Sequence, residues 1–325
     1  MSLRVAVVYG GRSGEHEVSV RSARAILDAL DPAKYEKTEY FIDKRGKWSP
    51  RPILPEPGAH PEIDVVFPVL HGTFGEDGTV QGLLELADLP YVGAGVLASS
   101  IAMDKEMTKR VCAAQMAPVV DYVVLVRGRP GAVAACSGLP FPVFVKPANL
   151  GSSVGISKAR DERELAEAIE LAGQYDRKIL VERGITGREL ECAVLGNEEP
   201  VASLPCEILP SREFYDYDDK YLLDRARVEL PARLSPEQTA EIRRLAVECY
   251  RAVECEGMAR VDFLLETSTG RLYVNEINTI PGFTSISMYP KMWEHCGVPF
   301  AALVERLIEL ALARHERKKA TRFTR

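Results

Sequence analysis

Short apolar runs alternate with segments of helical periodicity over the first third of the chain. Residues 5–9 form an apolar strand that runs into the turn sequence GGRSG, and a helix is expected to begin near Glu15. Residues 63–70 form a second apolar strand, which ends at His71. This alternation predicts a parallel sheet of βα units, whose ligands gather beyond the carboxyl ends of the strands.

Further elements follow along the chain. A helical pattern over residues 103–115 leads to Pro118, a candidate domain junction, and strands are expected at residues 143–146 and 179–182. Between these two strands, a helix is expected to begin at Asp161, because Glu164 follows three residues later as in an N-terminal capping motif.

Two helices are well marked in the last third. Ser235 and Gln238 have the spacing of a capping box, with a proline in the first helical position, and helical periodicity follows. The final helix follows Pro299 and also has a continuous apolar stripe. The order of strands and helices predicts a mixed fold of the α/β class, with parts that are α+β.

One predicted β-hairpin has polar groups on strands that alternation would otherwise bury. Arg260 and Asp262 lie on one face of the first strand, and Glu276 and Asn278 share a face of the second strand, residues 272–278. Two carboxylates and a carboxamide converge there, and these oxygen ligands suit Mg²⁺, with a substrate phosphate completing the coordination. The residues equally support a solvated hairpin face on which Arg260 neutralises the acids.

Composition narrows the possible functions. The 325 residues are 46% hydrophobic and 27% charged, which predicts two or three domains with a large core. The net charge of −6 argues against nucleic acid as a partner, and no uncharged run is long enough to cross a bilayer. Seven scattered cysteines without a Cys-x-x-Cys pair indicate reduced thiols in the cytoplasm and no zinc site.

A loop of small residues follows Lys146 at the end of a predicted strand. Gly151, Ser152 and Ser153 lie in this loop, whose backbone N–H groups can approach a polyphosphate. The loop lacks the Gly-Lys-Ser/Thr of a P-loop, and by itself it is better explained as an ordinary connection. Because the acids that suit Mg²⁺ follow later in the chain, a phosphate-binding loop becomes the better explanation.

The N-terminal glycines carry a weaker signal. Their spacing does not match the G-x-G-x-x-G of dinucleotide-binding folds, which argues against a nicotinamide cofactor. Glu15 is either a helix-start charge or a partner for a ligand's ammonium group. His71 is isolated in the sequence, so a structural role is its default interpretation.

Six motifs occur in order along the chain: Gly10-Gly-x-Ser13-x-Glu15-His16-Glu17-Val-Ser19, His71-Gly-x-x-Gly-Glu76-Asp77-Gly78, Met103-Asp104-Lys105, Lys146-Pro147 with Gly151-Ser-Ser-Val-Gly155, Tyr215-Asp-Tyr217-x-x-Lys220-Tyr221 and Asn275-Glu276-x-Asn278-Thr-x-Pro281-Gly282. Together they resemble the motifs of the D-alanine:D-alanine ligases of the ATP-grasp superfamily, from about residue 5 to about residue 310. The resemblance implies a three-domain ATP-grasp architecture. Its parts are an N-terminal Rossmann-like domain (residues 1–105), a central ATP-grasp domain (106–188) and a C-terminal ATP-grasp domain (189–325).

The resemblance also implies an activity: ATP-dependent joining of two D-alanine molecules through a D-alanyl phosphate, for peptidoglycan precursors. ATP would lie between the central and C-terminal domains. Its contacts would be Lys105, Lys146, Ser152, Ser153 and Lys220 around the phosphates, Glu182 and Glu189 on adenosine, and Arg183 and Ile185 beside the base. Arg183 departs from the lysine that is common at this position in the family. Asp262, Glu276 and Asn278 would hold Mg²⁺.

For the amino acids, the resemblance implies that Glu15 holds the first ammonium group and is linked through Ser152 to Tyr221. Arg260 would stabilise the oxyanion and contact the second carboxylate. Gly282, Ser287 and Met288 would assist it, and His71 would contribute to substrate binding. Residues 215–221 would form a lid, and the Lys220–Tyr221 pair indicates D-alanine rather than D-lactate as the second substrate.

Further expectations concern cofactors and assembly. Mg²⁺ is expected as two ions that Mn²⁺ can replace, K⁺ is a further candidate, and the chain is expected to form a cytoplasmic homodimer without nucleic-acid or membrane partners. The sequence leaves two alternative functions open. Another ATP-grasp ligase or biotin-dependent carboxylase would share the Lys146 loop and the hairpin, and a nucleotide-binding regulator could keep the ATP contacts without turnover.

Overall fold

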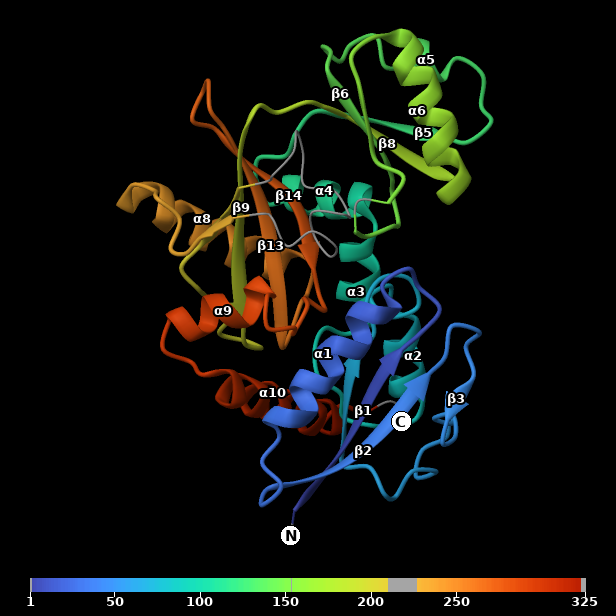
Figure 1. Ribbon diagram of the computed structural model, residues 1–325, viewed down its shortest axis with the longest axis vertical. Coiled ribbons are helices and arrows are strands. Elements are labelled where there is room, and N and C mark those ends of the chain that lie inside the picture. Colours follow the sequence, from blue (N-terminus) through green and yellow to red (C-terminus); the bar gives the residue numbers. More distant parts are fainter. Residues whose placement is uncertain (1, 153, 210–226, 323–325) are drawn as a thin grey trace.

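The computed structural model describes residues 2–152, 154–209 and 227–322, and its strands form three sheets (Figure 1). The N-terminal sheet has the order β3-β2-β1-β4, in which β2 and β4 run parallel to β1 and β3 runs antiparallel to β2. Its strands are β1 (Leu3–Gly10), β2 (Tyr35–Ile42), β3 (Trp48–Ser49) and β4 (Val65–Val69). The helices of this region are α1 (His16–Ala29), α2 (Thr79–Leu86) and α3 (Val96–Met103). The predicted parallel sheet is confirmed.

The second sheet, formed by residues of the middle of the chain, is antiparallel with the order β5-β8-β6-β7. Its strands are β5 (Tyr122–Val126), β6 (Val143–Pro147), β7 (Ser157–Ala159) and β8 (Lys178–Arg183), with helices α5 (Ala132–Ala135) and α6 (Glu162–Tyr175) packed beside it. Asp161 caps α6 by accepting a hydrogen bond of 2.8 Å from the Glu164 N–H, as the sequence predicts.

The third sheet has the order β12-β11-β9-β13-β14, with β10 paired to β9. Its strands are β9 (Gly187–Leu195), β10 (Val201–Ala202), β11 (Cys206–Leu209), β12 (Arg227–Glu229), β13 (Met258–Glu266) and β14 (Leu272–Asn278). The helices are α8 (Pro236–Ala252), α9 (Met288–His295) and α10 (Phe300–Lys319). The capping box of Ser235 and Gln238 is present, and the predicted hairpin is the pair β13–β14.

Helix α4 (Lys105–Ala114) connects the first two regions, and its predicted start at residue 103 is wrong. Met103 ends α3, and Asp104 leaves the helical conformation to accept a 3.1 Å hydrogen bond from the Met107 N–H, so that a new helix begins after it. Helix α4 contacts α8 and β14. Residues at the start of the proposed central domain therefore pack against the C-terminal sheet.

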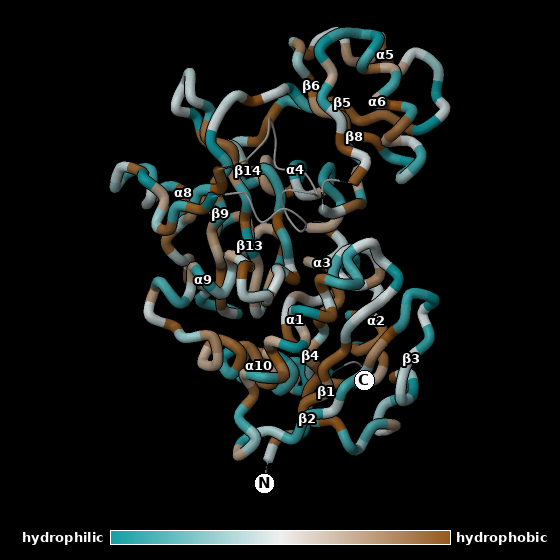
Figure 2. Tube along the Cα trace, viewed as in Figure 1, coloured by the Kyte–Doolittle hydropathy of each residue, from teal (hydrophilic) through white to brown (hydrophobic). Residues whose placement is uncertain are grey.

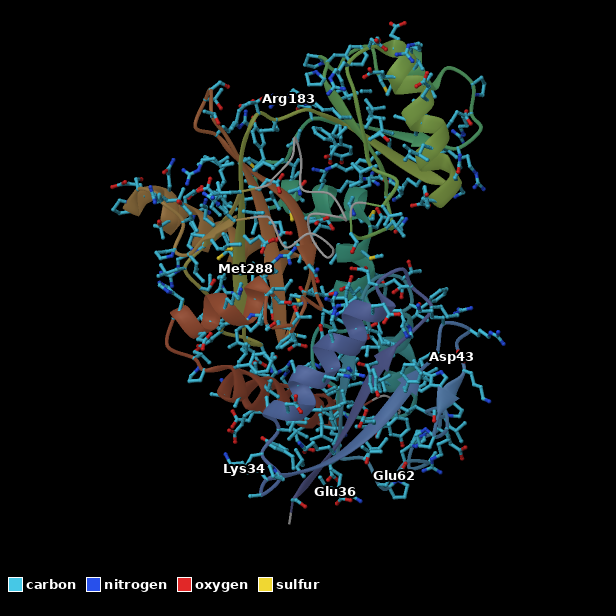
Figure 3. All side chains as sticks on the ribbon, viewed as in Figure 1. Lys34, Glu36, Asp43, Glu62, Arg183 and Met288 are labelled. Atoms are coloured by element: carbon cyan, nitrogen blue, oxygen red, sulfur yellow. The ribbon has the colours of Figure 1, made fainter. Side chains whose placement is uncertain are left out.

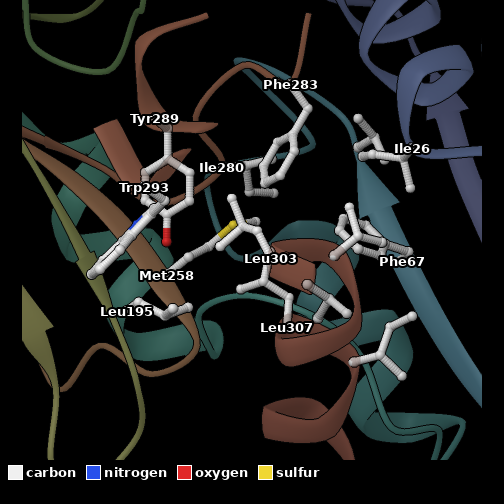
Figure 4. Close-up of a cluster of buried hydrophobic side chains, with 14 of the residues drawn as sticks. Ile26, Phe67, Leu195, Met258, Ile280, Phe283, Tyr289, Trp293, Leu303 and Leu307 are labelled. Carbon is white, nitrogen blue, oxygen red and sulfur yellow. The ribbon is translucent and has the colours of Figure 1, made fainter. Parts of the chain in front are cut away.

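The largest hydrophobic core joins the two ends of the chain. Buried residues of β1 and β4, among them Phe67, pack with α9, with Leu303 and Leu307 of α10, and with Phe283 in the loop before α9 (Figure 4). Figure 2 shows the corresponding hydrophobic positions along β1 and α10. Just beyond the carboxyl end of β4, His71 hydrogen-bonds to the Ile280 carbonyl in the loop that follows β14, so the parallel sheet also contacts the open end of the hairpin. None of the described helices has the length and apolar character needed to cross a membrane.

Candidate functional site

Two adjoining cavities lie between the three sheets. The first, of about 320 Å³, is lined by residues from the N-terminal region and the hairpin, and the second, of about 490 Å³, lies between the second and third sheets. Figure 3 labels one wall residue of each, Met288 in the first and Arg183 in the second. Lys105, Ser152 and Glu276 line both cavities, so they mark the place where the contents of the two would meet.

The hairpin brings the predicted oxygen ligands together. Asp262 on β13 lies directly opposite Glu276 on β14, and Arg260 lies opposite Asn278, so all four side chains share one face of the sheet. The register shifts between Asp262 and Phe263, and Asn275 is the extra residue on β14. The predicted placement of these residues on one face of the hairpin is present, and carboxylate and carboxamide oxygens are donors of the kind that Mg²⁺ accepts.

Arg260 holds the centre of this face. Its Nε and Nη2 donate to the two oxygens of Asp262 at 2.7 and 2.6 Å, and Glu191 Oε2 lies 3.4 Å from Nε. Burial lowers the pKa of Arg260, but Asp262, Glu191 and Glu276 outweigh it and raise that pKa well above its usual value. The guanidinium is therefore a permanent cation at the floor of the first cavity.

A buried cluster of charges lies at the floor of the second cavity. Glu182 forms ion pairs with Lys109 at 2.8 Å and with Lys146 at 2.6 Å. Burial alone would raise the pKa of Glu182, but the two lysines lower it to about 2, and burial lowers the pKa of Lys109. The carboxylate that the family resemblance assigns to adenosine is thus ionised and held by two cations.

The two lysines assigned to ATP phosphates converge on β14 from different elements. Lys105, the first residue of α4, donates to the Leu150 carbonyl at 2.7 Å and lies 3.5 Å from Glu276. Lys146, at the end of β6, donates to Asn275 at 3.5 Å. Both ammonium groups therefore lie beside the candidate metal ligands, where a polyphosphate chain would need cations.

Glu15 and Ser152 connect the N-terminal region to the small-residue loop. The Ser152 hydroxyl donates to the Glu15 carboxylate, and Ser152 adopts a left-handed backbone conformation with φ 54°. Gly72 is required beside them, because its φ is +70° and a Cβ there would lie 2.6 Å from Glu15 Oε2. The carboxylate of Glu15 is thus fixed at the wall of the first cavity.

His71 has protein partners on both ring nitrogens. Nδ1 donates to the Ile280 carbonyl at 3.0 Å, and Nε2 shares a 3.2 Å hydrogen bond with the Ser22 hydroxyl. Burial lowers its pKa, but the Glu76 carboxylate, 3.6 Å away, outweighs burial and leaves the pKa of His71 raised. The ring also lines the first cavity, so it ties the end of β4 to the loop that follows β14.

The loop after β14 supplies the remaining wall of the first cavity. Ser287 precedes α9, and its hydroxyl accepts a 3.0 Å hydrogen bond from the Thr284 N–H. A Cβ on Gly282 would lie 2.6 Å from Ser287 Oγ, which explains the glycine at this position. Met288 is buried and lines the same cavity.

Comparisons with known proteins agree over the whole chain. The family described as D-ala D-ala ligase C-terminus matches residues 112–309, and that described as D-ala D-ala ligase N-terminus matches residues 4–60 and 54–94. A D-alanine–D-alanine ligase from Solibacter usitatus is 76% identical over 325 residues, covering 100% of both chains. The chain belongs to the D-alanine–D-alanine ligase family.

Solved structures of the family share the fold. The D-alanine-D-alanine ligase from Coxiella burnetii matches with a TM-score of 0.88 and 40% identity, over 98% of this chain and 96% of that one. The VanG D-Ala:D-Ser ligase from Enterococcus faecalis matches with a TM-score of 0.87 and 35% identity, over 96% of this chain and 100% of that one. These matches confirm the expected mixed α/β architecture of ATP-grasp ligases.

Arg183, the departure from the family's usual lysine, has a contact that the sequence did not indicate. Its guanidinium donates to Glu266 at 2.8 Å and to the Tyr273 hydroxyl at 3.0 Å, so it links β8 to the turn end of the hairpin while lining the second cavity. Ile185 and Glu189 line the same cavity.

Some expectations fall outside the described residues, and some site residues were missed. Ser153, Lys220, Tyr221 and the proposed lid at 215–221 lie outside the described part of the chain. Sequence reasoning missed Lys109, although its position four residues after Lys105 on one helical face was a usable signal. It also missed Glu191, for which the only signal was a charge in a buried strand.

Proposed function

We propose that this ligase family member uses ATP to join two D-alanine molecules into D-alanyl-D-alanine for peptidoglycan precursors, through a D-alanyl phosphate. The observation that carries this proposal is the meeting of two cavities at Lys105, Ser152 and Glu276. One cavity has an anchor for an ammonium group at Glu15 and one for a carboxylate at Arg260, and the other has the lysines for a nucleotide.

The first step activates a carboxylate, which is a poor acceptor for an amine. Glu15 holds the ammonium group of the first D-alanine, so that its carboxylate points toward the junction of the cavities. That carboxylate attacks the γ-phosphorus of ATP and gives an acyl phosphate and ADP. Lys105 and Lys146 offset the negative charge that would otherwise repel the attack.

Asp262, Glu276 and Asn278 would hold Mg²⁺, because they present two carboxylates and a carboxamide on one face of the hairpin. The metal supplies charge neutralisation at the transferring phosphate. We further propose two such ions, their replacement by Mn²⁺, and K⁺ as an activating ion.

Glu182 and Glu189 bind adenosine, with Arg183 and Ile185 beside the base and Ser152, Ser153 and Lys220 around the phosphates.

The second step forms the peptide bond. The amine of the second D-alanine, once deprotonated, attacks the acyl carbonyl, and phosphate leaves. Arg260 and the Gly282 N–H stabilise the oxyanion, and Arg260 also holds the second carboxylate with Ser287 and Met288. His71 acts by fixing the loop that carries Gly282, since it donates to the Ile280 carbonyl.

The choice of the second substrate depends on residues beyond the shared fold. One structural neighbour is a D-Ala:D-Ser ligase, so the fold itself does not determine the acceptor. We propose that Lys220 and Tyr221 favour D-alanine over D-lactate as acceptor and that residues 215–221 close over the phosphates.

We also propose that the chain is divided into three domains, residues 1–105, 106–188 and 189–325.

We propose that the chain acts as a homodimer in the cytoplasm. Support comes from large apolar side chains exposed on α2 and α3, where Leu86 is 64% and Leu97 is 58% exposed. Sedimentation equilibrium of the parent should give twice the chain mass, and Leu97→Asp should shift the population toward monomer. A monomeric parent at micromolar concentration would refute the dimer.

The activity is tested with purified protein, ATP and Mg²⁺. With D-alanine, we expect ADP, phosphate and D-alanyl-D-alanine in equal amounts, identified by mass spectrometry. Phosphate release with L-alanine or without amino acid should be at background. Protein that binds ATP but gives no dipeptide with D-alanine would rule out the proposed activity.

A further inference from the structure

Glu191 lies beside Arg260 and takes no part in the reaction as described above. It is on β9 directly opposite Asp262, so it shares the face of the sheet that carries Arg260. Its side chain is 9% exposed, it lines the first cavity, and its Oε2 lies 3.4 Å from Arg260 Nε. A buried carboxylate at this distance from a catalytic arginine requires an explanation.

Two carboxylates, Asp262 and Glu191, lie beside Arg260, and we assign them different roles. Asp262 accepts both of its hydrogen bonds, at 2.7 and 2.6 Å, and Asp262 is also a proposed metal ligand. An oxygen that binds a divalent cation becomes a weaker acceptor for an arginine, because the cation takes up its charge. A buried guanidinium that loses its counter-ion is strongly destabilised, so Arg260 needs another carboxylate during the reaction.

We infer that Glu191 is the positioning residue of Arg260: it holds Nε of the guanidinium when Asp262 binds the metal. Because Glu191 lies at Nε rather than at the tip, it leaves both Nη groups available to the acyl phosphate and the second carboxylate once Nη2 is released from Asp262. The exchange of partners keeps Arg260 charged and oriented with and without metal. This inference rests on the proposed function, since it assigns Asp262 to the metal.

The kinetic test compares Glu191→Gln and Glu191→Asp with the parent. We expect Glu191→Gln to raise the KM for the second D-alanine about tenfold and to lower kcat, with the KM for ATP changed less than about twofold. Glu191→Asp keeps the charge and should restore part of both losses. Glu85→Gln is the control, because it removes a carboxylate that pairs with Lys318 outside the two cavities and should leave both constants unchanged.

A second readout does not depend on turnover. The ¹⁵N-edited signal of the Arg260 Nε–H, assigned by its loss in Arg260→Lys, is recorded without metal and with Mg²⁺ and ADP. In the parent, we expect a protected signal under both conditions. In Glu191→Gln, it should persist without metal, where Asp262 holds the guanidinium, and broaden or exchange away with Mg²⁺ and ADP.

The inference is overturned if Glu191→Gln keeps the parent's KM for the second D-alanine, or if its Nε–H signal stays protected with Mg²⁺ and ADP. If Glu191→Gln does not fold, the kinetic constants and the Nε–H signal are measured on Glu191→Asp instead, and the same changes are expected with smaller magnitude. A parent that makes no dipeptide refutes the proposed function, whereas the metal dependence of the Nε–H signal still decides the role of Glu191.

Discussion

At the scale of single residues, the site is organised by charges that hold one another in buried positions. Glu182 lies between Lys109 and Lys146, and Arg260 lies between Asp262 and Glu191. Buried ions are costly unless they are paired, and each of these six groups has a partner of opposite charge in the protein. The protein itself therefore holds these side chains in place.

Glu276→Gln removes the charge of one proposed metal ligand while keeping its shape. We expect kcat to fall by about 10²- to 10³-fold and the Mg²⁺ requirement to rise, since phosphate charge is less well neutralised. Steady-state rates over a Mg²⁺ series measure this, with Glu294→Gln on the exposed side of α9 as control. A near-parental rate at ordinary Mg²⁺ would mean that the hairpin acids are structural.

The acid stability of the protein should depend on Glu182. Its pKa is lowered from 4.5 to about 2, so the ionised carboxylate stabilises the fold above pH 4.5, and this contribution is lost as the pH falls through about 2. Between pH 4.5 and about 2, Glu182 is protonated in the unfolded chain but still ionised in the folded protein, so acid favours unfolding. The contribution to the free energy of unfolding is roughly 3 kcal/mol, at about 1.4 kcal/mol per pKa unit.

Urea denaturation at a series of pH values from 5 to about 3 tests this expectation. Glu182→Gln should be less stable than the parent at pH 7, because Lys109 and Lys146 lose their common counter-ion. Its stability should then fall less steeply with acid than that of the parent. Parallel pH profiles for the two proteins would contradict an ionised, ion-paired Glu182.

At the scale of elements, sequence predicts what is local. The caps of α6 and α8 and the β13–β14 hairpin follow from residues a few positions apart, and the structure contains them. Polar groups on one face of that hairpin were enough to predict their convergence. The break at Asp104 was missed, because apolar periodicity continues across it and only the capping geometry separates α3 from α4.

The unpredicted parts of the site depend on long-range pairing. Glu191 lies beside Arg260 only because β9 pairs with β13 in a register that places Glu191 opposite Asp262. Lys109 is buried only because α4 packs against β14 and α8. The elements that pack against Glu191 and Lys109 are distant from them in the sequence, so local periodicity could not identify either residue as part of the site.

Helix α10 should stabilise the protein by joining the C-terminal region to the parallel sheet. Leu307 is fully buried in the core that contains Phe67 of β4. Leu307→Ala should lower the free energy of unfolding by about 2–5 kcal/mol, because it removes buried methyl groups and leaves a cavity. Leu171→Ala on the exposed face of α6 is the control and should change it by less than about 1 kcal/mol. Equal effects in urea denaturation would mean that α10 is loosely attached.

At the scale of the whole molecule, the fold brings the carboxyl end of a parallel sheet, a loop of small residues and a polar hairpin to one place. Glu15, Ser152 and Arg260 come from these three parts and line one cavity, next to a second cavity with Lys146 and Glu182. The arrangement allows a phosphoryl group to pass from the nucleotide cavity to a carboxylate in the amino-acid cavity. That transfer is the central claim of the proposed mechanism.

Isotope transfer tests this claim directly. The protein is incubated with ATP, Mg²⁺ and D-alanine whose carboxylate carries ¹⁸O, and the released phosphate is analysed by mass spectrometry. Because the carboxylate oxygen that attacks the γ-phosphorus leaves with the phosphate, one ¹⁸O should appear in phosphate for each D-alanyl-D-alanine formed. Dipeptide formation with unlabelled phosphate would contradict a D-alanyl phosphate intermediate.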